Sequence, residues 1–225
     1  MSDFYSRLLE ATEAERTSMF EIPFVQHGVR GELSLESYVA FLTQAYHHVK
    51  HTTPLLMACG GRVPHEMEWL RDAIAHYIEE ELGHQEWILN DIAVCGADAE
   101  AVRHGTPGMP AELMCAYAYD IVQRRNPVGF LGMVLVLEGT SVELAIKAAK
   151  ATQANLKLPD NAFTYLNSHG SLDVSHMQFY QGLVNRLEGE EAQGFVIHTA
   201  KIFYKLYGDI FRNLPLILND AAHAA

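Results

Sequence analysis

Helical periodicity runs along almost the whole chain, and it restricts the possible folds more than any other feature. Apolar residues recur at the three- and four-residue intervals of amphipathic helices, as in LESYVAFLTQAYHHVKHTTPLLMAC. No alternating run of apolar and polar residues bounded by turn signals occurs, so no strand is expected. The chain is therefore predicted to be all-α.

Seven helices are expected, and glycine, proline or a capping serine marks most of their ends. Short loops between them predict a helical bundle that forms one domain over residues 1–225. The expected helices cover, to within a few residues, 3–19, 34–59, 64–95, 110–126, 127–156, 161–187 and 190–211.

Charge and composition argue against several classes of partner. The net charge is −12, from 16 basic and 28 acidic residues, which disfavours nucleic acid and anionic membranes. No apolar stretch reaches ~18 residues, so no membrane span is expected, and the N-terminus lacks the pattern of a signal peptide. The scattered Cys59, Cys95 and Cys115 form no CxxC, which favours a reduced, cytoplasmic protein.

The stretch HGSLDVSH places three polar side chains close together. His169, Asp173 and His176 are separated by four and then three positions. On a helix these offsets put all three side chains within roughly 60° of one another. Two interpretations are open, a solvated polar face or a metal site.

Two further segments supply carboxylates and another imidazole. Glu81 and His84 form an ExxH, the motif that places inward ligands in dinuclear iron bundles, although the run 79–81 also fits a solvated acidic face. Glu138 follows the apolar run FLGMVLVL, where an unpaired carboxylate is costly unless the helix emerges into solvent there.

Together these segments offer three carboxylates and three imidazoles. Mixed oxygen and nitrogen ligands suit iron or manganese better than magnesium. Six protein ligands are too many for one metal that keeps an open position, so they favour two metals with one bridging carboxylate. The candidate metal ligands are Glu81, His84, Glu138, His169, Asp173 and His176.

The order ExxH, a lone glutamate in an apolar helix, then HxxxDxxH resembles the heme-oxygenase-like diiron oxidases, a TenA/PqqC-like group also described as iron-containing redox proteins. Its relatives include a fatty-acid decarboxylase, an N-oxygenase and the chlamydial death-domain-associating protein. Glu138 lies 54 positions after His84, and His169 lies 31 after Glu138, which fits that family. The likeness in helix order covers nearly the whole chain.

The resemblance implies a seven-helix heme-oxygenase-like bundle with two non-heme iron ions between its core helices. One ion would be held by Glu81, His84 and His169 and the other by Asp173 and His176, with Glu138 shared and Glu80 as the alternative to Glu81. Manganese or a single metal ion is the alternative occupancy. The implied activity is oxidation of a small organic substrate with O₂, and a homodimer is expected.

Three other functions remain open on the same fold. TenA-type thiaminases resemble one another in having a cysteine nucleophile, usually in the long apolar helix. The corresponding region here reads GMVLVLEGTS, which contains no cysteine. Cys59 and Cys115 are expected to be core residues instead. A metal-free enzyme of cofactor biosynthesis, like pyrroloquinoline-quinone synthase, needs a cationic pocket, and no basic cluster is evident. A non-enzymatic binding or regulatory protein is the third.

Several residues are candidates for a substrate cavity rather than for metal binding. His47, His48 and His51 form a second histidine cluster with no carboxylate at a matching helical offset. They are expected to line a pocket or to lie on the surface. The larger apolar candidates for a cavity wall are Phe41, Tyr46, Trp87, Met133 and Met177.

Overall fold

The computed structural model describes residues 3–219, which form twelve α-helices and three 3-10 turns. Within that range the one β pairing is an isolated bridge between Leu33 and Leu218. The all-α prediction is therefore confirmed, and the count of seven helices is wrong. The helices are α1 (Phe4–Ala11), α2 (Glu13–Phe20), α3 (Pro23–Arg30), α4 (Leu35–Val49), α5 (Thr52–Arg62), α6 (Glu68–Glu81), α7 (His84–Val94), α8 (Ala99–His104), α9 (Met109–Arg124), α10 (Phe130–Leu156), α11 (Thr164–Val184) and α12 (Glu190–Arg212).

The larger number arises mainly because three expected helices are each broken into two. The first breaks at Thr12, between α1 and α2. The second begins as predicted, with the Ser34 side chain accepting a hydrogen bond from the Ser37 amide, but breaks at Lys50 and His51. It then continues through the expected glycine stop to Arg62, because buried packing of one face outweighs the low helix propensity of glycine.

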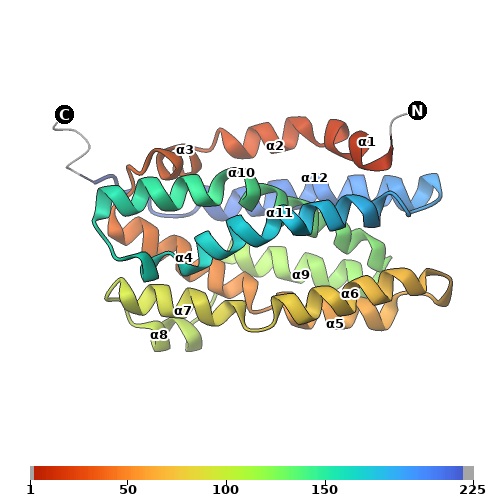
Figure 1. Ribbon diagram of the computed structural model, residues 1–225, viewed down its shortest axis with the longest axis horizontal. Coiled ribbons are helices and arrows are strands. Elements are labelled where there is room, and N and C mark those ends of the chain that lie inside the picture. The colour runs from red at the N-terminus through yellow and green to blue at the C-terminus, as the bar shows by residue number, and fades with distance from the viewer. Residues whose placement is uncertain (1–2, 220–225) are drawn as a thin grey trace.

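The third break separates α6 from α7 and matters most for function. Leu82 adopts an extended conformation and Gly83 has φ of 90°, a left-handed value that glycine adopts without steric cost. The two halves remain nearly in line along the molecule (Figure 1). The predicted continuous helix from Pro64 to Cys95 is therefore wrong at the ExxH itself.

Two short helices were not expected, although each carries a local signal. Helix α3 has Pro23 in its first turn and ends at Gly31, which has φ of 72°. Helix α8 is capped by Asp98, whose side chain accepts a hydrogen bond from the Ala101 amide. Both signals belong to helices of eight residues or fewer, a length at which amphipathic periodicity is weak.

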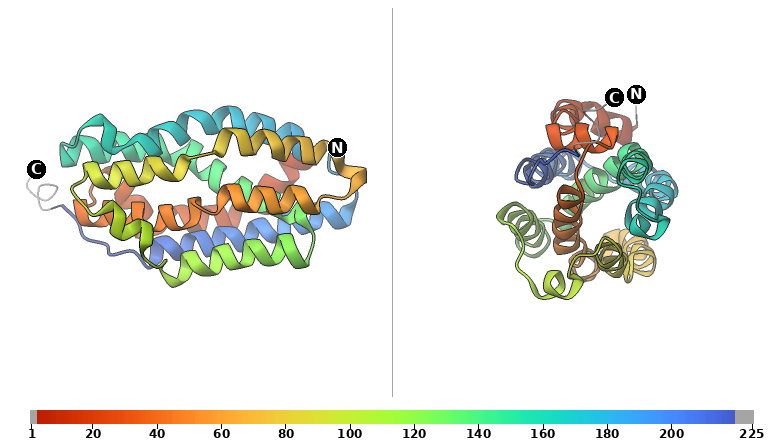
Figure 2. Two further views of the ribbon diagram at one scale, coloured as in Figure 1. Left: turned by 90° about the horizontal axis from the view of Figure 1, so that it is seen from below. Right: turned by 90° about the vertical axis from the view of Figure 1, so that its left-hand side faces the viewer.

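Helix α10 packs against α11, α12 and α3, and the residues of its first two turns are buried. Seen end-on, the helices run roughly along one axis, and α10 lies beside α11 at one edge of the bundle (Figure 2). Among the described residues, 127–156 is the one segment long and apolar enough to cross a membrane. An 18-residue window within it has a mean hydropathy of 1.6, and half of that window is buried in the bundle. Core packing thus accounts for its apolar composition.

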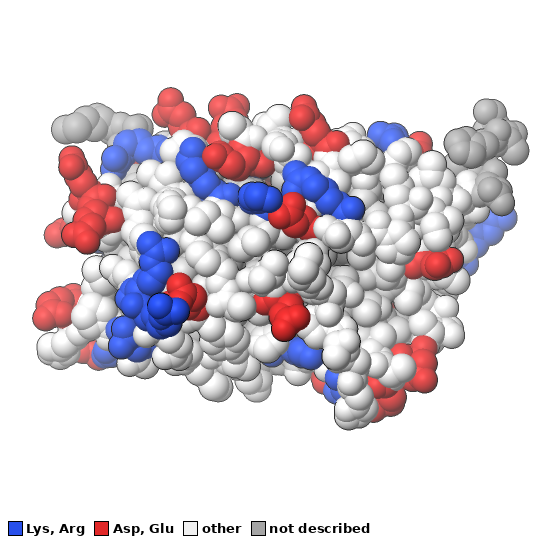
Figure 3. Space-filling view, turned by 180° about the vertical axis from the view of Figure 1, so that it is seen from behind, with Lys and Arg blue, Asp and Glu red and all other residues white. Residues whose placement is uncertain are grey.

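Charged side chains on the face seen from behind are scattered. Figure 3 shows Lys and Arg interspersed with Asp and Glu across mostly uncharged surface. Among the described residues, this face offers no continuous basic strip of the kind that binds nucleic acid.

Candidate metal centre

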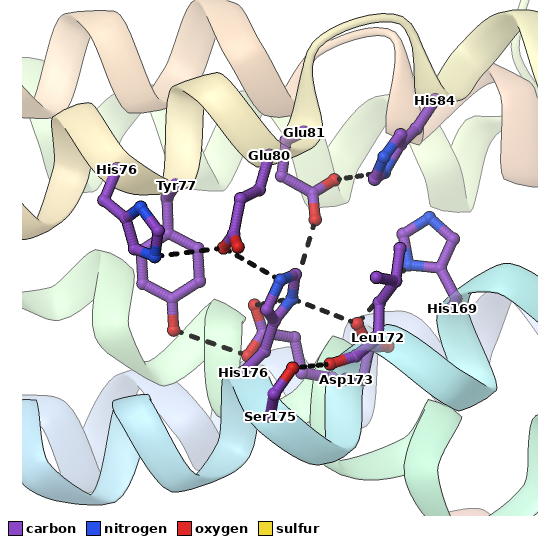
Figure 4. A network of polar contacts seen from close by, with 11 residues as sticks. His76, Tyr77, Glu80, Glu81, His84, His169, Leu172, Asp173, Ser175 and His176 are labelled. Carbon is purple, nitrogen blue, oxygen red and sulfur yellow. Dashed lines mark hydrogen bonds and ion pairs between the residues drawn. The ribbon is translucent and has the colours of Figure 1, made fainter.

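The six candidate ligands come from four helices, α6, α7, α10 and α11. Glu81 is the last residue of α6 and His84 the first of α7, so the left-handed turn at Gly83 directs both side chains toward α11 (Figure 4). Helix α11 carries His169, Asp173 and His176, and α10 carries Glu138.

Two local contacts set the position of α11. Asp91 of α7 is fully buried, and its two carboxylate oxygens accept hydrogen bonds from the Thr164 and Tyr165 amides at the start of α11. Gly170 allows α11 to approach α10, because a Cβ at that position would lie 2.5 Å from Cγ1 of Ile146. The glycine in HGSLDVSH therefore brings this helix face close to Glu138.

The donor atoms fall into two groups that share one carboxylate. Ligand atoms of Glu81, His84 and His169 lie within 4.8 Å of one another, and so do those of Glu81, Glu138 and His176. Nδ1 of His84 is 3.0 Å from Oε2 of Glu81. All six candidates are brought together, because Asp173 joins both groups.

Asp173 lies between the two histidines of its own helix. Its Oδ1 is 3.3 Å from Nδ1 of His176 and 3.6 Å from Nδ1 of His169. The side chain is only 2% exposed. Both imidazoles of HGSLDVSH therefore face one buried carboxylate, which excludes the solvated-face interpretation for this helix.

The geometry differs from the resemblance in which carboxylate is shared. Glu81, and not Glu138, belongs to both groups. Glu80 occupies a different place, with Oε2 3.0 Å from Nε2 of His176 and a side chain that is 37% exposed, whereas that of Glu81 is 8% exposed. Of the two alternatives for the first position, Glu81 is thus the buried and central one.

Several buried polar atoms of this cluster have no hydrogen-bond partner. They are Nε2 of His169, Oδ1 of Asp173 and both ring nitrogens of His176. The contact between His176 and Glu80 is short, but it lacks the direction of a hydrogen bond. Since buried polar atoms are nearly always paired, oxygen and nitrogen atoms converging in this way fit a bound cation.

The ionisation of the cluster reflects the same crowding of negative charge. Burial, together with the charges of Asp173 and Glu81, raises the pKa of Glu138 well above its usual range. Burial alone would lower the pKa of His176, but the Asp173 carboxylate 3.3 Å from its Nδ1 and the charges of Glu80 and Glu81 raise it. A divalent cation placed here would offset this repulsion.

Aromatic side chains hold the ligands in place. The Tyr77 hydroxyl donates a hydrogen bond of 3.5 Å to Oε2 of Glu138. Trp87 stacks on His84 with ring centroids 3.9 Å apart, and Tyr165 contacts His169 with centroids 4.9 Å apart. Such partners fix the orientation of ligating rings and carboxylates.

An apolar cavity of about 160 Å³ adjoins the cluster. Its wall includes Glu81, Glu138, His169 and Asp173 among side chains from seven helices. Of the expected wall residues, Phe41 and Met133 belong to it, whereas Tyr46, Trp87 and Met177 do not; of the second histidine cluster, only His48 does. The described lining contains no lysine, arginine or cysteine.

None of the three cysteines lies in the described wall of this cavity. Cys59 and Cys115 are buried core residues, as expected, and burial raises the pKa of each thiol to about 12.

Comparison with known proteins agrees with this geometry. Residues 39–208 match the model of a family described as iron-containing redox enzymes. The chain belongs to the iron-containing redox enzyme family. The match includes all four helices that supply the candidate ligands. No curated protein matches this family member.

Solved structures place this iron-containing redox enzyme family member in the heme-oxygenase-like fold. A domain of unknown function with that fold from Shewanella denitrificans is 23% identical over 93% of this chain and 90% of its own, with a TM-score of 0.83. A TenA homologue from Pseudomonas syringae is 12% identical over 93% and 91%, with a TM-score of 0.78. Heme oxygenase-1 from Synechocystis, in complex with heme, is 12% identical over 94% and 91%, with a TM-score of 0.74.

Proposed function

We propose that the protein is a non-heme dinuclear iron oxidase that uses O₂ to oxidise a small organic substrate. The observation that carries this proposal is the convergence of six buried or nearly buried donors from four helices, with Glu81 common to two ligand groups. Two metal ions bridged by one carboxylate fit such an arrangement. Membership in the iron-containing redox enzyme family supports iron over manganese.

The chain's own residues would have distinct tasks. Glu81, His84 and His169 would hold one ion, and Glu81, Glu138 and His176 the other, with Asp173 completing the set. Iron held there would relay electrons from the organic substrate to O₂, so that the substrate is oxidised and O₂ is reduced. Tyr77 orients Glu138 through its hydroxyl, and the apolar cavity excludes water from the reacting groups.

The test is anaerobic loading with ferrous iron, followed by removal of unbound metal, a metal count and exposure to O₂. About two iron ions per chain and an absorption change on O₂ exposure are expected. In His176→Ala at least one iron should be lost together with the absorption change. His65→Ala is the matched control, because the His65 side chain is 91% exposed and distant from these ligands in the chain.

Two results would contradict the proposal. One is less than about half an iron per chain in the wild type after loading. The other is an equal iron content in His176→Ala and wild type. A circular dichroism spectrum of the variant, unchanged from wild type, is required so that metal loss is not attributed to unfolding.

The TenA-type alternative makes a different prediction about cysteine. Release of the pyrimidine alcohol from thiamin needs a thiolate nucleophile, and the buried thiols of Cys59 and Cys115 have raised pKa values. None of the cysteines lies in the wall of the cavity that adjoins the metal centre. Efficient thiamin cleavage by the purified protein, lost on changing one cysteine to serine, would favour this alternative.

The setting of the enzyme is part of the proposal. Cys59, Cys95 and Cys115 are free, which suits a reducing cytoplasm. A small molecule and O₂ are the proposed partners, and the homodimer expected from the resemblance stays a prediction.

A further inference from the structure

The cavity beside the candidate metal centre is mostly apolar, and its described wall carries no basic side chain. An inference about its occupant rests on the proposed function, because the cavity is taken as the substrate site. Its described lining contains the carboxylates of Glu81, Glu138 and Asp173 but no lysine or arginine. In the metal-free protein, an anion would be desolvated there beside three carboxylates and without a cationic side chain.

The size of the cavity limits the occupant. A volume of about 160 Å³ is close to that of engineered apolar protein cavities of ~150 Å³ that bind benzene. Phenylalanine, leucine and valine side chains from α3, α4 and α10 form much of the wall. A compact, mostly apolar molecule therefore matches both its volume and its surface.

Three polar side chains of the cavity wall outside the ligand set, His48, Thr140 and Ser141, have a buried atom with no hydrogen-bond partner. Thr140 and Ser141 follow Glu138 within three positions of α10, whereas His48, which is 2% exposed, comes from α4, a helix that supplies no candidate ligand. Tyr207 packs edge-on against the ring, with centroids 5.7 Å apart, and supplies no hydrogen bond to it. An unpaired buried polar atom is unfavourable, so a ligand that pairs with it gains affinity.

The charge state of His48 fits recognition of a neutral group. Burial, with contributions from His169, His51 and His47, lowers the pKa of His48 to about 3. The ring is therefore neutral at physiological pH, with one nitrogen as donor and the other as acceptor. A hydroxyl or carbonyl group can pair with such a ring.

We propose that the cavity binds a compact, mostly apolar substrate with an uncharged hydrogen-bonding group, and that His48 is the residue that binds and orients this group. The hydrogen bond would fix which carbon of the substrate faces the metal centre. His48 is thus a specificity-determining residue outside the ligand set.

The test compares three probes of one shape on the metal-free, full-length protein by titration calorimetry. The probes are toluene, benzyl alcohol and benzoate. In the wild type, benzyl alcohol should bind about tenfold tighter than toluene, as one net hydrogen bond provides. Benzoate should bind at least about tenfold more weakly than benzyl alcohol.

Two variants of His48 isolate the hydrogen bond. His48→Phe should bind toluene normally and lose the preference for benzyl alcohol, whereas His48→Gln should retain most of it. His47→Phe is the control, because His47 is buried but does not line the cavity. Should His48→Phe not fold, the ¹⁵N resonances of the wild-type His48 ring give the same comparison, and they should shift with benzyl alcohol but not with toluene.

The opposite results would overturn the inference. These are equal affinity for benzyl alcohol and toluene in the wild type, an undiminished preference in His48→Phe, or benzoate as the tightest ligand. Because no iron is present, the outcome is independent of metal loading. A protein that binds no iron but shows the His48-dependent preference would refute the proposed oxidase and leave this binding site intact.

Discussion

Two histidine clusters of this molecule differ in the polar side chains that surround them. The carboxylate–histidine cluster, defined by Glu81, His84, Glu138, His169, Asp173 and His176, alternates imidazoles with carboxylates within hydrogen-bonding or ion-pairing distance. The second histidine cluster, His47, His48 and His51, has Lys50 and Tyr119 as its polar neighbours instead. Both lie at a break between two helices.

These neighbours shift the pKa values of histidines in the two clusters in opposite directions. Burial lowers the pKa of His47 to about 4 and that of His48 to about 3, because no carboxylate compensates the loss of solvation. In the first cluster, carboxylates raise the pKa of His176 despite burial. A group of histidines alone therefore does not identify a cation site. The carboxylates among them do.

The largest expected effect is on the carboxylate common to both ligand groups. Glu81→Gln should reduce retention of iron at least about 100-fold, since even indirect partners of metal ligands contribute 10- to 100-fold. Glu80→Gln should have a smaller effect, because Glu80 contacts only His176 of the cluster, and the exposed Glu79→Gln none. Metal analysis after dialysis against chelators of increasing affinity measures the iron retained by each of the three variants. Equal iron losses in Glu80→Gln and Glu81→Gln would contradict the central position assigned to Glu81.

The pH dependence of the metal-free protein should separate the clusters next. The folded pKa of His48, about 3, lies below its ordinary value of 6.5, so its contribution to stability is full above pH 6.5 and falls as the pH drops. Between pH 7 and 5 the loss should be about 2 kcal/mol. His48→Gln should flatten this slope in denaturant titrations. A slope equal to that of the wild type would contradict the buried, neutral state.

The first cluster should respond in the opposite direction. Because the folded pKa of Glu138 is raised, its contribution to stability is present at low pH and is lost as the pH rises above the usual range of a glutamate. Glu138→Gln should therefore stabilise the metal-free protein at pH 8 relative to wild type. Metal loading should remove this difference, because a cation replaces the proton.

The close approach of α11 to α10 at Gly170 should affect the carboxylate–histidine cluster and not the second histidine cluster. Gly170→Ala should cost about 1–2 kcal/mol and weaken iron retention, because the added methyl overlaps Ile146 and pushes α11 from α10. Gly182→Ala in the same helix is the matched control. It meets no atom within 4 Å and should be neutral or slightly stabilising. Denaturant titration of both variants, with an iron count, tests the pair.

The smallest effect should come from a single hydroxyl. Tyr77→Phe removes the 3.5 Å hydrogen bond to Glu138 and should weaken iron retention by about three- to tenfold. Tyr119→Phe removes the equivalent contact to His51 in the second cluster, where Oη lies 3.1 Å from Nδ1, and should leave iron retention unchanged. A reduction in both variants would point to a general loss of rigidity.

Sequence pattern predicted the helical class and the common face of His169, Asp173 and His176, because both depend on spacing along a single helix. His169, Asp173 and His176 share a face at any position of the bundle. It did not predict that Glu81, instead of Glu138, is common to both groups, since that depends on how α6, α10 and α11 cross. The hydrogen bonds that Asp91 accepts from the first amides of α11 could not be predicted from the sequence either, because Asp91 lies in another helix.

The left-handed turn at Gly83 would also give a cation bound at the candidate metal centre a mechanical role. On a continuous helix the two residues of an ExxH would move together, whereas here Glu81 ends α6 and His84 begins α7. A cation bound by both side chains would cross-link the two helices at the point where they meet. Helices α6 and α7 extend from there toward opposite ends of the molecule (Figure 1). Loss of the cation would therefore remove a cross-link between α6 and α7 as well as the ion that the proposed reaction needs.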